Sequence, residues 1–273
     1  MSKTEMAKTE MVKTEPAAEP VYRRNLDDAP RPVAAMATSL PAGHAIPFHL
    51  HRRGQLLYAV SGVMRVETER AAWILPPARA LWLPPQWPHS VSMRSRVEMR
   101  TIYVAPATCE TLAKQPVLAE ITGLLRELIL VLLKEPTDYD ETGRGGAVAR
   151  LILDELTRLS ERPLEVPMPR DPRALRVARA LLDDCRIDHD LDRWADDAGA
   201  SRRTLARLFR SETGLGFAEW RARLRAIDGL ARLSAGASVA ETAAAVGYAS
   251  PSAFSAMIHR TLGGPPRRLI RAA

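Results

Sequence analysis

The spacing of hydrophobic positions changes along the chain and divides it into parts with different expected structure. From about residue 32 to 107, short apolar runs alternate with polar residues, as in 60–68, 80–83 and 97–104. Turn residues such as Gly62 interrupt them at roughly ten-residue spacing, which is typical of short strands in a sandwich or barrel. We therefore predict a β domain in the first half of the chain.

Helical spacing begins at Pro116 and continues through the middle of the chain. Apolar residues recur there every three to four positions up to Leu132 and again from Val148 to Leu159, after a Gly-rich break at 142–146. This pattern predicts two amphipathic helices. Both have more apolar positions than one buried face needs, so they pack either on the β domain or against a second chain. The four prolines between 162 and 172 predict a linker.

The last part of the chain contains one motif twice, at 192–214 and 239–263. In each copy an alanine lies four residues before a glycine, a serine then begins a helix, and a second glycine ends it. Glycine adopts the positive φ of a tight turn, and serine caps a helix N-terminus. The pattern predicts two helix-turn-helix units, joined by one long helix over 217–235.

Composition places most of the positive charge in this last part. The 273 residues carry a net charge of +7, of which residues 170–273 contribute +6. These residues hold 18 arginines and no lysine. A basic domain behind a nearly neutral one indicates a polyanionic partner, although the use of arginine alone is also explained by a GC-rich genome.

Several classes of protein do not fit the sequence. No apolar run approaches the ~18 residues that span a membrane, and the first residues lack the apolar core of a secretion signal. Cys109 and Cys185 are too few for a disulfide framework or a zinc finger. We expect a cytoplasmic protein that makes no contact with membranes. Its N-terminal repeat, 1–20, is expected to be disordered.

The C-terminal motifs resemble those of the AraC/XylS family of bacterial transcription regulators. The resemblance covers about 100 residues, including both copies and the helix between them. It rests on four motifs: Ser201-x3-Leu205-x-Arg207-x-Phe209, Glu212-Thr213-Gly214, Gly247-Tyr248-x-Ser250-x3-Phe254 and Leu262-Gly263-x-Pro265. The likeness implies that each unit places its second helix in the major groove of DNA, on successive turns of one face.

The resemblance also assigns DNA-facing residues. In the first recognition helix the base-facing positions are Arg203, Ala206 and Arg207, and the remaining candidates are Ser201, Arg202, Thr204 and Arg210. In the second the base-facing positions are Pro251, Ser252, Ala253 and Ala256, with Ser255, His259 and Arg260 completing the candidate set. Arginine reads guanine bidentately, whereas small side chains do not, so we expect the first unit to supply most of the sequence discrimination.

The β part resembles the cupin fold, a small β-barrel common among sensor domains of AraC regulators. The matching segments are Gly43-x5-His49-x-His51-x3-Gln55-x6-Gly62 and Pro84-x-Gln86-x2-His89. Gln55 replaces the usual glutamate, Ala78 and Gln86 replace glycines, and Met93 replaces an asparagine. The spacing otherwise fits throughout.

This second resemblance implies a ligand site. His49, His51 and His89 occupy the cupin metal positions, and Gln55 adds an amide oxygen, a set compatible with Zn, Ni, Mn or Fe. The alternative is a metal-free pocket in which the histidines bond to one another or to an effector. Trp73 and Trp82 are candidates to line the pocket, although core packing explains aromatic residues equally well.

Together these observations predict an α+β multidomain protein. We expect a disordered tail at 1–30, a cupin-like β-barrel for ligand sensing at 31–115, linking helices that form a dimerisation segment at 116–162, a linker at 163–172, and an all-α domain with two helix-turn-helix units at 173–273. The expected function is sequence-specific transcription regulation. The expected partners are operator DNA, a small-molecule effector or divalent metal, a second copy in a homodimer, and RNA polymerase.

Two other functions are alternatives to this one. A metal-dependent cupin enzyme, such as a dioxygenase or isomerase, needs no pair of helix-turn-helix units and usually has the glutamate that Gln55 replaces. A non-specific DNA binder would bind random DNA in a salt-dependent manner without a preferred site. No Ser/His/Asp arrangement or phosphate-binding loop is visible in the sequence.

Overall fold

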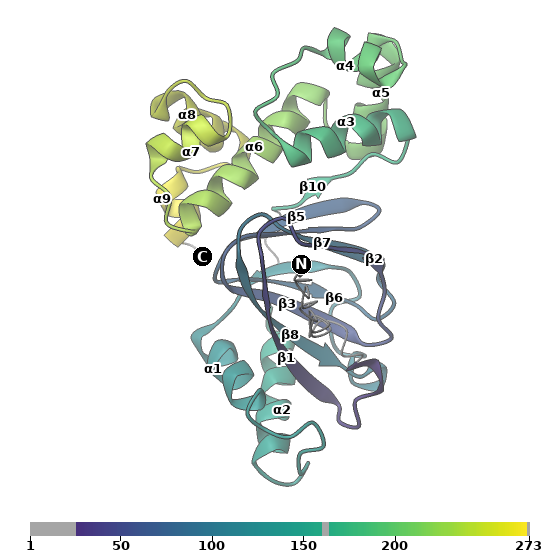
Figure 1. Cartoon of the computed structure of the whole chain (residues 1–273), viewed down its shortest axis with the longest axis vertical. Coiled ribbons are helices and arrows are strands. Elements are labelled where there is room, and N and C mark those ends of the chain that lie inside the picture. Colours follow the sequence, from purple (N-terminus) through teal and green to yellow (C-terminus); the bar gives the residue numbers. More distant parts are fainter. Residues whose placement is uncertain (1–25, 160–163, 272–273) are drawn as a thin grey trace, which may run out of the picture.

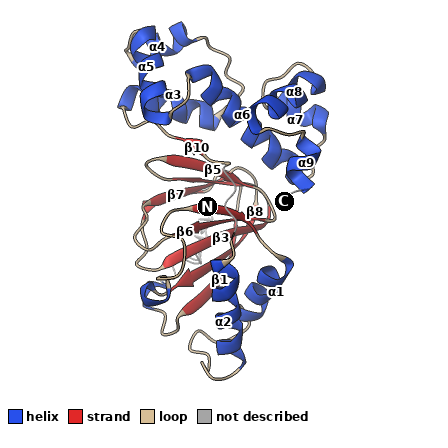
Figure 2. Ribbon diagram, turned by 180° about the vertical axis from the view of Figure 1, so that it is seen from behind, coloured by secondary structure: helices blue, strands red, loops and turns tan. Residues whose placement is uncertain are grey.

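A β domain lies at the centre of the molecule, with two helices on one side and a helical domain on the other (Figures 1 and 2). The computed structural model describes residues 26–159 and 164–271. The predicted α+β organisation, with strands first and helix-turn-helix units last, is confirmed.

Two five-stranded antiparallel sheets form the β domain. The first contains, in spatial order, β1 (Val33–Leu40), β8 (Val97–Val104), β3 (Gly54–Ser61), β6 (Arg79–Leu83) and β9 (Val117–Glu120). The second contains β10 (Val166–Pro167), β5 (Ala71–Leu75), β4 (Met64–Glu67), β7 (His89–Met93) and β2 (Ala45–His49). The strands expected at 80–83 and 97–104 are present as β6 and β8.

The two sheets remain open and do not form the expected closed barrel. Over the described ranges, no strand of one sheet pairs with a strand of the other. The consecutive strands β5 and β6 would be natural partners at one end, but β5 pairs with β10 and β6 pairs with β9. Each sheet is thereby extended instead of being joined to its neighbour.

Alternation along the strands separates two apolar cores. In β6, Leu81 and Leu83 pack between the sheets, whereas Ala80 and Trp82 pack on the opposite face. That opposite face is covered by α1 (Gly123–Leu132) and α2 (Arg144–Thr157), which lie side by side below the first sheet. Each of the two helices therefore packs one apolar face against the first sheet of the β domain.

The first predicted helix begins later than its apolar spacing indicates. Residues 117–120 form strand β9, which pairs with the edge of β6 from Trp82↔Val117 to Arg79↔Glu120. Helix α1 starts only after Thr122, whose side chain accepts a hydrogen bond from the Leu125 N–H. Apolar runs of this length are compatible with either a buried strand or a helix. Here residues 117–120 form a strand because the edge of β6 is free to pair with them.

Part of the predicted N-terminal tail is structured. Residues 1–25 lie outside the described residues, but Leu26–Asp28 form a 3₁₀ helix. The Arg53 side chain donates hydrogen bonds to the carbonyl oxygens of Asp27 and Ala29 and holds this turn on the β domain. Arg53 is buried, so the turn is anchored by a desolvated cation.

The predicted linker joins the two domains by completing a sheet. Its residues Val166 and Pro167 form β10, and the N–H of Met168 donates to the Arg70 carbonyl at 2.7 Å. The indole N–H of Trp220, in the long helix of the DNA-binding domain, donates to the Pro167 carbonyl at 2.6 Å. The linker is thus packed between the second sheet and the helices.

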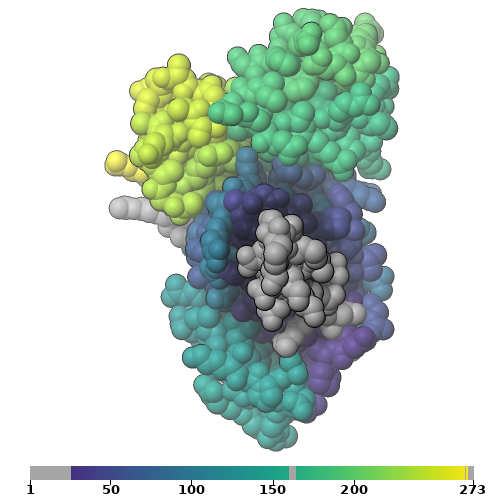
Figure 3. Space-filling model, viewed as in Figure 1, coloured from purple at the N-terminus to yellow at the C-terminus, as the bar shows by residue number. Residues whose placement is uncertain are grey.

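The C-terminal domain contains the two predicted helix-turn-helix units. Its helices are α3 (Pro172–Asp183), α4 (Leu191–Ala198), α5 (Arg202–Thr213), α6 (Phe217–Ser234), α7 (Val239–Ala245), α8 (Pro251–Leu262) and α9 (Pro266–Arg271). Helix α6 runs from one unit to the other, and the units form two separate lobes, green and yellow in Figure 3. None of the helices described is long and apolar enough to cross a membrane.

Candidate ligand site and DNA interface

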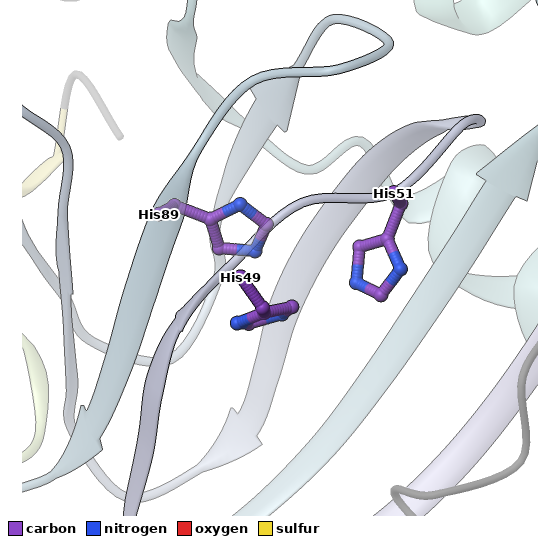
Figure 4. Close-up of side chains that lie close together, drawn as sticks. All are labelled: His49, His51 and His89. Carbon is purple, nitrogen blue, oxygen red and sulfur yellow. The ribbon is translucent and has the colours of Figure 1, made fainter.

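Three histidines meet between the two sheets, two from strands of the second sheet and one from the loop that follows β2. His49 ends β2 and lies opposite His89 at the start of β7, and His51 follows two residues after His49 (Figure 4). The ring centroid of His49 lies 4.4 Å from that of His89 and 4.9 Å from that of His51. Their candidate ligand atoms all lie within 4.8 Å of one another.

Hydrogen bonds to the backbone fix the tautomer of two of these rings. Nδ1 of His49 lies 2.8 Å from the Pro47 carbonyl, and Nδ1 of His89 lies 2.9 Å from the Trp87 carbonyl. Since a carbonyl oxygen only accepts, both Nδ1 atoms carry the proton and each Nε2 keeps its lone pair. Nε2 of His89 is buried without a hydrogen-bond partner in the described structure. Backbone contacts of this kind orient histidines that bind metals.

Burial keeps two of the imidazoles neutral. Desolvation lowers the pKa of His89 to about 3, against a smaller opposing effect of its bond to the Trp87 carbonyl. Desolvation also lowers the pKa of His51, and nearby His49 adds to this effect. The neutral form is the one that binds metal ions, so both rings are ready to bind a metal at neutral pH.

Gln55 lies on the same inter-sheet side and is held by a residue that the sequence did not indicate. Its amide N–H donates to the Tyr103 hydroxyl at 3.1 Å, and its oxygen is buried without a partner in the part of the chain described. The Tyr103 ring also lies 5.1 Å from His51, centroid to centroid. Tyr103 shares a strand face with Val97 and Met99, and this alternation was the only signal for its position.

These donors fit a divalent metal ion. Three imidazoles and an amide oxygen suit zinc, nickel, manganese or iron. Metal–nitrogen bonds of about 2.1 Å place two donors at most about 4.2 Å apart, so the rings need only a small inward movement from their present spacing. The unpartnered Nε2 of His89 is a buried polar atom that such an ion would satisfy.

The two candidate tryptophans lie in different cores. Trp73 is buried in the core between the sheets, on the side of the histidines. Trp82 points to the opposite face of the first sheet, where its indole N–H donates to the Ala113 carbonyl at 2.9 Å. The structure therefore does not bring Trp82 to the histidine site.

The first recognition helix, α5, presents its predicted polar side to solvent. The Ser201 side chain accepts from the Thr204 N–H at 3.1 Å and caps the helix. Gly199, in the preceding turn, has a φ of +66°, as its motif predicted. Leu205, Leu208 and Phe209 are buried, so the opposite side is left for DNA.

The four arginines of α5 differ in their surroundings. Arg202 pairs with Asp192 at 2.7 Å, and Arg210 pairs with Glu219 at 3.2 Å. Arg203 and Arg207 are exposed and have no partner among the described residues. Ala206 lies between them on the helix surface and is partly buried. The free guanidinium groups are thus those at the predicted base-facing positions.

The second recognition helix, α8, offers a different surface. Ser250 caps it by accepting from the Ala253 N–H at 3.2 Å, and Phe254 and Ile258 are buried as their spacing predicted. Its exposed candidates are Pro251, Ser252, Ala253, Ala256, His259 and Arg260, with Ser255 partly buried. Its first turns are therefore small and uncharged, and its last turn is basic.

Comparison with known proteins agrees with both parts of this description. The family described as AraC-like ligand binding domain matches residues 39–156, and the family described as helix-turn-helix domain matches residues 194–272. The HTH-type transcriptional regulator NimR of Escherichia coli K12 is 32% identical over 246 residues, which are 87% of this chain and 88% of NimR. The chain belongs to the AraC family of transcription regulators. It is a DNA-binding transcription regulator with an N-terminal ligand-binding domain.

Other proteins are also similar to this chain, over different shares of its length. The HTH-type regulator RipA of Corynebacterium glutamicum is 35% identical over 119 residues, which are 44% of this chain and 34% of RipA. Apo ToxT K231A from Vibrio cholerae is 11% identical, with 88% of this chain and 97% of ToxT covered and a TM-score of 0.38. The DNA-binding domain of AdpA, solved with a target DNA, is 33% identical over 37% of this chain and 92% of that domain, with a TM-score of 0.34.

Proposed function

We propose that α5 reads the operator sequence and that α8 mainly positions the protein on the DNA backbone. The observation that carries this is the pairing pattern on α5. Arg203 and Arg207 are exposed with no partner in the described residues, whereas acidic residues already engage Arg202 and Arg210. A free guanidinium can take both acceptors of a guanine edge. His259 and Arg260 on α8 suit phosphate contacts, which fix register without specifying sequence.

The proposed signal is a divalent metal ion in the histidine site. His49, His51 and His89 would hold it, with the Gln55 oxygen as a weaker ligand. A three-histidine site leaves coordination positions open, and an anionic small-molecule effector would bind there. The buried Nε2 of His89, which has no partner among the described residues, supports this proposal over a metal-free pocket.

The finer assignments of the sensor are also proposals. We infer a cupin-like domain from the two facing sheets and from the position of His49 opposite His89. A homodimer through α1 and α2 is supported by the exposed Leu124, Leu130 and Leu151 on these helices. RNA polymerase is the remaining proposed partner. We also propose the predicted domain limits, with strand β9 added to the sensor.

Operator binding with and without metal tests the sensing proposal. The operator is first identified by selecting bound genomic fragments with the full chain. Its affinity is then measured on metal-free protein and after addition of Zn²⁺, Ni²⁺ or Mn²⁺. We expect one of these ions to change the affinity at least tenfold in wild type and to have no effect in His49→Ala or His89→Ala.

The variants separate sensing from DNA binding. His49 and His89 lie far along the chain from the recognition helices, so metal-free variants should bind the operator as metal-free wild type does. A wild-type protein that retains no ion, with operator affinity unaffected by any of the three, would contradict metal sensing. Random DNA bound as tightly as the selected fragments would instead contradict sequence-specific regulation.

A further inference from the structure

His51 differs from His49 and His89 in the group that lies next to its Nδ1 atom. Nδ1 of His49 and His89 each contact a backbone carbonyl, whereas Nδ1 of His51 lies 3.9 Å from the Asp27 carboxylate oxygen Oδ2. All three rings therefore turn the same nitrogen toward an oxygen. This common arrangement leaves the Nε2 atoms of the rings as the metal-binding atoms.

Asp27 is held in place by buried contacts. It belongs to the 3₁₀ helix Leu26–Asp28, and its side chain is only 14% exposed. The guanidinium of Arg53 donates to the Asp27 carbonyl at 3.2 Å and to the Arg31 carbonyl at 3.0 Å. The Arg53 N–H also donates to the other carboxylate oxygen of Asp27 at 3.4 Å. The carboxylate is thus positioned by the fold and not by a freely moving tail.

We propose that Asp27 is the positioning residue of the metal site and acts through His51. Its carboxylate holds the His51 proton on Nδ1, so that the Nε2 lone pair faces the ion. The two atoms lie 3.9 Å apart, so a hydrogen bond of about 2.9 Å requires the His51 ring and the Asp27 carboxylate to approach each other by about 1 Å. This inference rests on the proposed metal sensing.

The proposal also accounts for the missing acidic ligand. With an amide at position 55, the four donors carry no negative charge to balance a divalent ion. A carboxylate behind a metal-bound histidine supplies that charge from the second layer of contacts and strengthens the metal–nitrogen bond. Asp27 is the acidic group that the structure places against one of the three histidines.

Metal titration of the full chain tests this role. Metal-free wild type, Asp27→Ala, Asp27→Asn and Asp28→Ala are titrated with Zn²⁺ and with Ni²⁺. We expect Asp27→Ala to weaken binding about 10- to 100-fold, the usual loss for such an outer partner. Asp27→Asn keeps an acceptor oxygen but loses the charge, so its loss should be smaller. Asp28 pairs with Arg52 at the surface, and its variant should match wild type.

A spectroscopic measurement separates positioning from a purely structural effect. Long-range ¹H–¹⁵N spectra of the metal-free proteins report which ring nitrogen of each histidine carries the proton. We expect His51 to be protonated on Nδ1 in wild type and Asp27→Asn, and to show a mixture of tautomers in Asp27→Ala. His49 and His89 should keep their tautomers in all variants, because backbone carbonyls hold them.

Two results would overturn the inference, and they differ in what else they affect. Wild-type affinity and an unchanged His51 tautomer in Asp27→Ala would remove the role of Asp27 but leave the metal site, provided that His89→Ala abolishes binding. A wild-type chain that binds none of the ions would remove both the metal site and the role of Asp27. Neither result would affect the assignment to the family of DNA-binding regulators.

Discussion

At the scale of single residues, ion pairs determine which of the predicted DNA-binding arginines of α5 remain available to contact DNA. The sequence places four arginines on one side of α5, and only the family resemblance separates Arg203 and Arg207 as base-facing from the other two. The structure pairs Arg202 with Asp192 across the turn and Arg210 with Glu219 from the next helix. The two acids lie on the neighbouring helices α4 and α6 and not in the motif that carries the arginines, so the pairs become visible only in the fold. Arg203 and Arg207 remain for the DNA.

Substitution of Arg207 tests base reading. We expect Arg207→Ala to lose about 1–3 kcal/mol of discrimination at one base pair of the operator, because the bidentate contact is removed. Arg260→Ala on α8 should weaken all sequences alike, as expected for a phosphate contact. Arg202→Ala is the matched control on α5. Selection of bound sequences from a randomised operator measures all three, and equal, sequence-independent losses in Arg207→Ala and Arg260→Ala would contradict the assignment.

Burial of His89 should make stability depend on pH. Its pKa is about 3 in the folded protein and about 6.5 when unfolded, so between these values the unfolded chain binds the additional proton. Stability is therefore lost as the pH falls below about 6.5. From pH 7 to pH 5 the loss attributable to His89 should be about 2 kcal/mol.

Urea unfolding of metal-free protein at the two pH values measures this loss. His89→Gln is the comparison, because glutamine does not titrate and the other histidines contribute equally to both proteins. An equal pH dependence in wild type and variant would show that burial does not lower the pKa of His89 in the folded state.

At the scale of elements, the sequence predicted the helices, which depend on neighbouring residues, better than the strands, which depend on pairing with segments far away in the chain. Both helix-turn-helix units follow from serine caps, turn glycines and apolar residues four apart, all of which act within a few residues. By contrast, β9 and β10 exist because β6 and β5 offer open edges elsewhere in the chain. The same distant pairing leaves the predicted barrel open. Asp27 was assigned to the tail for a related reason, since Arg53 anchors it from another segment.

The contact between α6 and α8 depends on a glycine within α6. A Cβ at Gly229 would lie 2.6 Å from a ring carbon of Phe254, which is fully buried. We expect Gly229→Ala to destabilise the domain by about 1–3 kcal/mol, because the buried ring has to move. Gly123→Ala, in α1, is the control, since a Cβ added there would have no other atom within 4 Å. Thermal unfolding compares the two, and a neutral Gly229→Ala would show that α8 shifts without cost.

At the scale of the whole molecule, one sheet connects the ligand site to the DNA-binding domain. His49 and His89 lie on β2 and β7, and the linker strand β10 is the opposite edge of the same sheet. Trp220 of α6 bonds to that edge strand. Ion pairs add to the contact: Arg65 of β4 pairs with Asp183 of α3 at 2.8 Å. A change at the histidines therefore has a continuous packed route to α6, and the sequence alone indicated none of these contacts.

The ion pair between Arg94 and Asp228 is the most buried of these domain contacts. Arg94 follows β7, and Asp228 lies on α6 with its side chain only 2% exposed, where it also pairs with Arg232 at 3.0 Å. Removal of Arg94 leaves the carboxylate with one cation in place of two. We expect Arg94→Ala to weaken the domain contact by about 1–3 kcal/mol, the range for a buried hydrogen bond to a charged group.

The functional effect of this change should be on coupling. With the contact weakened, the operator affinities of metal-bound and metal-free Arg94→Ala should approach each other, while each form still binds DNA through intact α5 and α8. Arg96→Ala is the matched control, because Arg96 is 74% exposed and lies 3.8 Å from Glu98 within the sensor. Operator titrations of both variants, with and without the active ion, measure the coupling. An unchanged difference in Arg94→Ala would mean that the ligand signal reaches the DNA-binding domain without this ion pair.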